Sequence, residues 1–102
     1  MKKSMRKVTV ILPDWMSKEG AQEEVMRNLH ARALLKMELY RSKMKPFEAK
    51  YGTTFPRFQR QLSKRSHEDF TVWDDLMEWE ACYRAYREWK QRHAELRQWL
   101  GR

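Results

Sequence analysis

Residues 66–100, SHEDFTVWDDLMEWEACYRAYREWKQRHAELRQWL, decide the fold of this chain. The segment holds four of the five tryptophans and contains neither glycine nor proline. Apolar residues recur in it every three or four positions, which predicts one long helix from about residue 69 to residue 100. Ser66 and Asp69 match a capping box at the start of this helix.

The apolar positions of this helix fall on two seams. The first seam contains Val72, Leu76, Trp79, Tyr83 and Tyr86, and the second contains Cys82, Ala85, Trp89, Leu96 and Trp99. A hairpin of two helices buries only one seam of each helix. The second seam therefore predicts a further neighbour, such as a second copy of the chain or a partner protein.

Two other helices are predicted before it. The first runs from about residue 18 to residue 45, with Ser17 as its N-cap and Pro46 as a residue that kinks or breaks it. Residues 47–51 are a candidate for a further turn, ended by Gly52. Its apolar stripe contains Val25, Leu29, Ala33, Met37, Tyr40, Met44, Phe47 and Tyr51. A short helix follows at about residues 55–64. The fold class is therefore mainly α: a single helical domain over residues 1–102, built as a long antiparallel hairpin with a short intervening helix.

The N-terminal segment is the only convincing strand candidate. Val8, Val10 and Leu12 alternate with other residues over about residues 5–12, and Pro13 ends the run. A lone strand cannot satisfy its own backbone N–H and C=O groups. We therefore expect it to pair with its copy in a second subunit or with a sheet edge of another protein. The alternative is that residues 1–13 form a basic arm that packs on the helices or stays disordered.

Charge is distributed unevenly along the chain, whose net charge is +8. Residues 1–65 contain 16 Lys and Arg against 6 Asp and Glu, and residues 81–102 contain 6 basic residues against 2 acids. Residues 66–80 between them contain six acids and no Lys or Arg. The order is basic, acidic, basic, so the chain is not expected to behave as a uniform polycation.

The remaining composition bears on location. The lone Cys82 excludes an intramolecular disulfide and favours the reducing cytoplasm. No apolar run approaches the roughly 20 residues that a membrane span needs. The run at residues 8–12 is also too short for the core of a signal peptide. We therefore expect a cytoplasmic protein with no membrane contact.

The sequence offers little for catalysis. His30, His67 and His93 lie far apart without metal-ligand spacing, and the three glycines form no phosphate-binding loop. Asp74 and Glu78 stand one helical turn apart, which leaves a carboxylate-dependent nuclease as an outside alternative. Acids in the first turns of a helix more often complement its dipole. We therefore expect no enzyme activity, no catalytic residue, no metal and no cofactor.

The acidic block is also a candidate binding surface, because tryptophan beside carboxylates suits an interface with a basic partner. The candidate partner-binding residues are Trp73, Asp74, Asp75, Glu78, Trp79 and Glu80. Contact with DNA or RNA would instead use the basic residues of the first half of the chain. The candidate nucleic-acid-binding residues are Lys2, Lys3, Arg6, Lys7, Arg41, Lys43 and Lys45.

The middle of the chain resembles a group of small helical proteins of bacteria and archaea. MELYRSKMKPFEAKYGTTFPRFQRQL (residues 37–62) and HEDFTVWDDLMEWEACYRAY (residues 67–86) follow their pattern of a long helix, a KYG turn, a T-F-x-x-F helix and a W-D-D-x-x-E-W segment. The matching residues are Tyr40, Phe47, Lys50, Tyr51, Gly52, Thr54, Phe55, Phe58, Trp73, Asp74, Asp75, Glu78 and Trp79. Those proteins look like antitoxins encoded beside short toxin genes. KVTVILPDW (residues 7–15) is similar to the opening ribbon of ribbon–helix–helix repressors, although the helix that follows is too long for that family.

The resemblance and the acidic block imply a non-enzymatic, antitoxin-like protein. It would bind and neutralise a cognate toxin, with a ribonuclease as one candidate, or another basic protein, through its helical body. The basic N-terminal half adds an expectation of DNA binding. Two alternatives stand beside this one: a nucleic-acid-binding module without a protein client, and a structural helical subunit of a larger complex. In each case we expect a homo- or hetero-oligomer.

Overall fold

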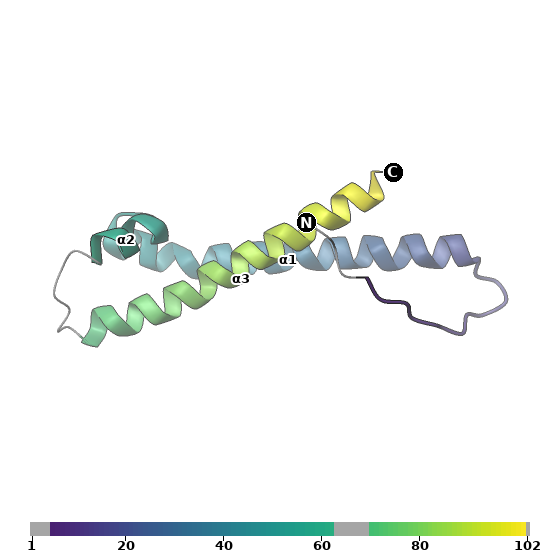
Figure 1. The fold of residues 1–102 in the computed structure, drawn as a ribbon, viewed down its shortest axis with the longest axis horizontal. Helices are drawn as coiled ribbons and strands as arrows, with labels where there is room; N and C mark the ends of the chain where they lie inside the picture. Colours follow the sequence, from purple (N-terminus) through teal and green to yellow (C-terminus); the bar gives the residue numbers. More distant parts are fainter. Residues whose placement is uncertain (1–4, 63–69, 102) are drawn as a thin grey trace.

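A computed structural model describes residues 5–62 and 70–101 of the chain. Three helices make up most of this part: α1 (Lys18–Tyr51), α2 (Phe55–Leu62) and α3 (Phe70–Leu100). α1 and α3 form a long hairpin, and α2 lies at the end where α1 finishes and α3 begins (Figure 1). The prediction of a mainly helical chain with a long hairpin and a short intervening helix is therefore confirmed. The capping box predicted before α3 lies outside the described residues.

The hairpin has two distinct ends. The α2 end contains the last turns of α1, α2 and the first turns of α3, and the far end contains the start of α1 and the end of α3 (Figure 1). Lys50 pairs with Asp75 at the α2 end, and His30 stacks on His93 nearer the far end. These two pairs define the antiparallel register. The molecule is elongated, with extents of 63 × 28 × 23 Å.

α1 is capped at both ends by residues suited to the task. Ser17 has an extended backbone, and its side-chain oxygen accepts a hydrogen bond from the Gly20 N–H at 3.0 Å. At the other end, Gly52 has a φ of 64°, and its N–H donates to the Glu48 carbonyl at 2.8 Å. Glycine suits this position because any other side chain is strained at positive φ.

α1 does not end near residue 45, the bound predicted for it, and the further turn foreseen over residues 47–51, ended by Gly52, belongs to the same helix. α1 continues through Pro46 to Tyr51. A proline inside a helix removes a backbone donor and costs about 3 kcal/mol. The turn beyond it persists because the rings of Phe47 and Tyr51 stack on Trp79, with centroids 5.7 and 5.8 Å away. Packing between helices therefore outweighs the local effect of the proline.

Residues 5–12 form no β-strand, so the predicted N-terminal strand is not found. The segment is irregular, and it turns back from the start of α1 toward the middle of the molecule (Figure 1). A strand needs a neighbour to satisfy its backbone N–H and C=O groups. The described part of this single chain contains no second strand that could serve as that neighbour.

The core lies at the α2 end around Trp79, which is fully buried. Phe55 and Phe58 of α2 pack their rings against the Trp79 indole, at centroid distances of 5.5 and 5.1 Å. Met44 of α1 and Cys82 of α3 complete the buried cluster. Because aromatic side chains of α1 and α2 converge on one indole of α3, all three helices are fixed to one another here.

Both ends of the second seam of α3 lie against other parts of the hairpin. Cys82, at the start of this seam, belongs to the core around Trp79. Farther along, His93 stacks on His30 of α1, with ring centroids 4.2 Å apart. The last member, Trp99, lines a hollow together with residues from the first turns of α1. The side of α3 that meets α1 therefore changes along the helix, from the core around Trp79 to His93 and Trp99 nearer the far end.

Candidate partner-binding surface

An exposed hydrophobic strip lies on the first turns of α3. Phe70, Trp73 and Met77 expose 82%, 50% and 62% of their surface, respectively. Their spacing, i, i+3 and i+7, places them on one side of the helix. Large apolar side chains that are exposed next to one another often mark a binding surface.

Two carboxylates border this strip. Asp74 and Glu78 are exposed and stand one helical turn apart, beside the hydrophobic residues in the helical projection. The α3 face, as the term is used below, consists of Phe70, Trp73, Asp74, Met77 and Glu78. A surface with an apolar centre and an anionic edge fits a partner that presents apolar groups beside cations.

Asp75 lies on the side of α3 that faces α1, where it connects the two helices. Its carboxylate accepts hydrogen bonds from Lys50 Nζ at 2.6 Å and from the Tyr51 hydroxyl at 2.5 Å. These bonds, the one from Lys50 first, hold the pKa of Asp75 below its ordinary value. The hydrogen bond to Asp75 also raises the pKa of Lys50. Asp75 therefore fastens α3 to α1 and is not part of the α3 face.

Trp79 and Glu80 also lie apart from the α3 face. Trp79 is fully buried, so it is a core residue and not the partner anchor that the sequence suggested. Glu80 forms an ion pair with Arg84, in which Nη2 of the arginine lies 2.8 Å from Oε1 of the glutamate. Of the predicted partner-binding residues, Trp73, Asp74 and Glu78 therefore come together at the surface. Phe70 and Met77 were not predicted; their helical spacing from Trp73 is the signal that identifies them.

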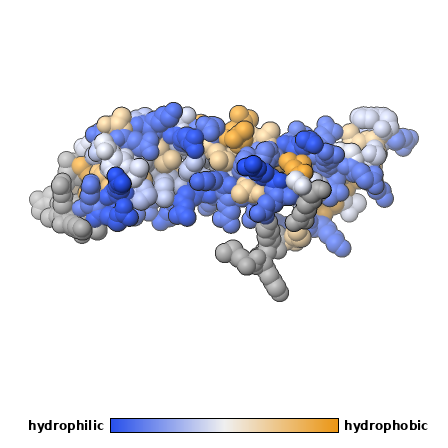
Figure 2. All heavy atoms as spheres, turned by 90° about the horizontal axis from the view of Figure 1, so that it is seen from above, coloured by the Kyte–Doolittle hydropathy of each residue, from blue (hydrophilic) through white to orange (hydrophobic). Residues whose placement is uncertain are grey.

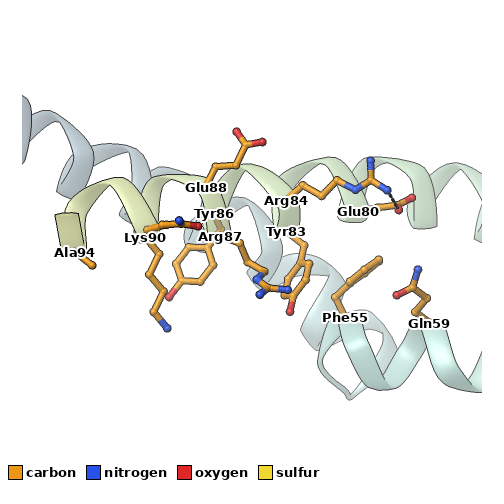
Figure 3. A pocket seen from close by; sticks show the side chains of 11 residues that line it. Phe55, Gln59, Glu80, Tyr83, Arg84, Tyr86, Arg87, Glu88, Lys90 and Ala94 are labelled. Atoms are coloured by element: carbon orange, nitrogen blue, oxygen red, sulfur yellow. Dashed lines mark hydrogen bonds and ion pairs between the residues drawn. The ribbon is translucent and has the colours of Figure 1, made fainter. Parts of the chain in front are cut away.

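A second surface feature is an open groove of about 840 Å³ between α2 and α3. Phe55 and Gln59 line it from α2, and Tyr83 and Tyr86 line it from α3 (Figure 3). The groove lies next to the core, since Phe55 belongs to both. Sequence patterns did not indicate this groove, because it depends on how α2 sits against the side of α3.

Cations gather along the groove. The Arg87 guanidinium lies over the ring of Tyr83 at 5.9 Å, and the Lys90 ammonium lies over the ring of Tyr86 at 6.0 Å. Two acids, Glu80 and Glu88, line the groove as well; Glu80 is paired with Arg84, and in Figure 3 the Glu88 carboxylate lies on the opposite side of α3 from Lys90. Because both tyrosine rings already have a cation over them, the groove suits an anionic group better than a stacked base.

The predicted nucleic-acid-binding residues of α1 do not form one surface. Arg41 donates from Nη2 to the Tyr86 hydroxyl at 2.9 Å, and this bond raises the pKa of Arg41. Lys43 lies over the ring of Tyr40 at 5.5 Å, and helical spacing turns it away from Arg41. Lys45 is exposed. Arg41 thus helps to hold α1 against α3, at the edge of the groove.

The remaining predicted basic residues belong to the N-terminal segment. Arg6 and Lys7 are exposed in its irregular backbone. Lys2 and Lys3 lie outside the described residues. The basic residues of α1 and of this segment are therefore not joined into one site in the described chain.

The described residues offer no arrangement for metal or thiol chemistry. No group of three or more His, Cys, Asp or Glu side chains among them could hold a metal ion. Cys82 is buried, and burial raises the pKa of its thiol, which keeps the unreactive protonated form. None of the described helices is long and apolar enough to span a lipid bilayer.

Comparison with known proteins adds no relative. Neither the protein-family models nor the curated proteins gave a significant match to this chain, and no solved structure did so. The likeness to antitoxins and to ribbon–helix–helix repressors therefore stays a prediction.

Proposed function

We propose that the protein is a non-enzymatic binding protein of the antitoxin kind, which captures a basic partner protein on the α3 face. The observation that carries the proposal is the exposed strip of Phe70, Trp73 and Met77 beside the carboxylates of Asp74 and Glu78. An aromatic anchor surrounded by less buried groups is typical of the residues that dominate binding energy at protein interfaces. The two carboxylates would attract and orient a cationic partner.

A ribonuclease toxin would fit this chemistry. Such an enzyme binds RNA phosphates with Lys and Arg side chains, as phosphate recognition requires. Carboxylates placed over those cations compete with the phosphates, so the enzyme is neutralised without any catalytic step in the binding protein.

Capture of the basic protein encoded by the adjacent gene tests the proposal. Replacing Asp74 and Glu78 by lysine should abolish co-purification, because the α3 face would then repel a cationic partner. Trp73→Ala should weaken capture by about tenfold or more, since interface tryptophans are frequent anchors. Glu24→Lys is the matched control, because Glu24 is exposed on α1 outside the α3 face. If the unchanged chain captures no basic protein, or if all variants capture it equally, the proposal fails.

Nucleic-acid binding is the second candidate function, supported by Arg87 and Lys90 at the groove. Phosphate groups could approach both cations from solvent, because the groove is open (Figure 3). Arg87→Gln combined with Lys90→Gln should lower the affinity for single-stranded RNA or DNA and reduce its dependence on salt. Arg57→Gln, which changes an exposed basic residue of α2, is the control. Absence of binding at low ionic strength would exclude this function.

A further inference from the structure

The N-terminal arm, residues 5–12, is a basic and hydrophobic segment with little support from its own chain. All of its residues up to Ile11 are exposed, and Ile11 itself exposes 97% of its surface. Met5, Val8 and Val10 are exposed as well, and Arg6 and Lys7 stand between them. A contiguous apolar segment in water is unfavourable, so the arm requires a surface that covers it.

The α3 face has the complementary character. It presents Phe70, Trp73 and Met77 where the arm presents aliphatic side chains, and it presents Asp74 and Glu78 where the arm presents Arg6 and Lys7. Both surfaces are exposed in the single chain. Contact between them would bury apolar area on both sides and pair cations with carboxylates.

The aliphatic side chains of the arm cannot reach the α3 face of their own chain, and Arg6 could at most approach its near edge with the arm fully extended. The Lys50–Asp75 pair places this face beside Lys50, which lies about 48 Å along α1 from Lys18 at 1.5 Å per residue. Ile11 precedes Lys18 by seven residues, and a fully extended chain of that length spans at most about 25 Å. Arg6 precedes Lys18 by twelve residues, which span at most about 43 Å. Figure 1 shows the arm leaving from the far end of the hairpin, opposite to the start of α3.

From this geometry we propose that a second copy of the chain supplies the arm, so that two copies form an antiparallel dimer in which each arm docks on the partner copy's α3 face. Antiparallel association brings the far end of one hairpin beside the α2 end of the other. The two arm–face contacts are then equivalent, and the assembly closes after two copies.

Exposed apolar residues on α1 lie where such a dimer would have its centre. Val25, Leu29, Leu35 and Leu39 are exposed and share roughly a third of the circumference of the helix. The first two belong to the apolar stripe predicted for this helix, and both are exposed in the single chain. The four residues lie between the far end and the α2 end of the hairpin. Figure 2 shows hydrophobic residues at the surface in several places along the molecule. A two-fold axis near the middle of α1 would bring this stripe against its own copy.

The inference rests on the proposed function, because the dimer uses the same α3 face as the basic partner. The arm then acts as an internal competitor: a partner gains the face only by displacing the arm of the second copy. Loss of the arm should therefore dissolve the dimer and make capture of the partner easier. If each arm paired only with the other arm, loss of the arm would still dissolve the dimer, but it would not make capture of the partner easier.

A charge swap measured by light scattering after size-exclusion chromatography tests the dimer. The full chain should be dimeric at micromolar concentration. Arg6→Glu with Lys7→Glu, or Asp74→Lys with Glu78→Lys, should each weaken dimerisation by about tenfold or more, since like charges then face each other. The four changes together should restore the dimer. Arg57→Glu, an exposed basic residue on α2, should leave it unchanged.

Three results would overturn the inference: a monomer at every concentration, a dimer that neither reversal weakens, or two weakened variants whose combination stays monomeric. If the two arms paired with each other instead, Asp74→Lys with Glu78→Lys would leave the strength of dimerisation unchanged. Capture of the basic protein from the adjacent gene is measured on the same variants. A dimer without capture contradicts the proposed function alone, and capture by a chain that is always monomeric contradicts the inference alone.

Discussion

Trp79 is the residue on which the packing of all three helices depends. Its indole is fully buried, and rings from α1 and α2 surround it. Trp79→Ala should lower the free energy of unfolding by about 3–5 kcal/mol, because the cavity left behind adds to the lost burial. Trp15→Ala, at a residue that is 80% exposed, should change it by about 0.5 kcal/mol or less. Urea unfolding followed by circular dichroism measures both, and equal losses would contradict this description of the core.

Asp75 makes stability depend on pH in the acid range. Its folded pKa is lowered by the hydrogen bonds from Lys50 and Tyr51, so the folded state binds fewer protons than the unfolded state there. The stabilisation is complete above the unfolded value of about 3.9 and is lost as pH falls through the folded pKa. Asp75→Asn should be less stable than the unchanged chain at pH 6, and the difference should shrink toward pH 2. Asp74→Asn, without these two donors, serves as the control in the same thermal melts.

At the scale of the elements, α1 and α3 meet through a pair of histidines nearer the far end. His30 and His93 stack at 4.2 Å, and burial lowers the pKa of His93, with His30 and Arg97 adding to the effect. The unfolded state therefore takes up a proton first as pH falls, so this contribution to stability is present above about pH 6.5 and is lost as pH falls through the folded pKa of His93. The protection factors of backbone amides in the first half of α1, which are exchange rates corrected for the intrinsic effect of pH, should fall between pH 7 and pH 5. His93→Leu should remove most of this pH dependence. If the variant shows the same pH dependence as the unchanged chain, His93 is not its cause.

The bounds of α1 and α3 show which features of a helix can be predicted from local sequence. α3 begins at Phe70 and ends at Leu100, close to the predicted bounds, because apolar periodicity is local information. The predicted end of α1 was wrong at Pro46, because the aromatic contacts that hold the last turn come from α2 and α3. Periodicity also placed Val25 and Leu29 on the apolar stripe of α1, and both are exposed in the single chain. A stripe shows that a helix has an apolar side and does not show which neighbour covers it.

The candidate site was predictable only in part, because a sequence shows local patterns but not which side of a helix a neighbour covers. The acidic block and Trp73 were visible in the sequence, and they lie together at the start of α3. Which tryptophan lies inside required the fold, since Trp73 and Trp79 have similar neighbours in sequence but point to different sides of the helix. The groove between α2 and α3 could not be predicted, because no local pattern reports the angle at which two helices meet.

At the scale of the whole molecule, the single chain is an open rod. Its Cα radius of gyration is 19.3 Å, whereas a compact domain of 100 residues has about 13 Å. Small-angle X-ray scattering of a sample dilute enough to be monomeric should give a radius of gyration close to the 19.3 Å of the single chain. A side-by-side antiparallel dimer would have twice the mass with little increase in length, so its cross-section should grow with concentration more than its longest dimension does. A value near that of a compact domain would contradict the hairpin.

The confinement of the tight core to one end of the rod bears on how long the chain survives in a cell. Segments with few buried contacts open at small free energies, while a packed core opens only with global unfolding. The α2 end, gathered around Trp79, belongs to the second kind, whereas the exposed segment at residues 5–11 belongs to the first. A protease would therefore cut the chain from its N-terminal side and leave the aromatic end until last. An occupant that covered the exposed segment would slow this turnover, so the abundance of the chain would follow the abundance of whatever binds it.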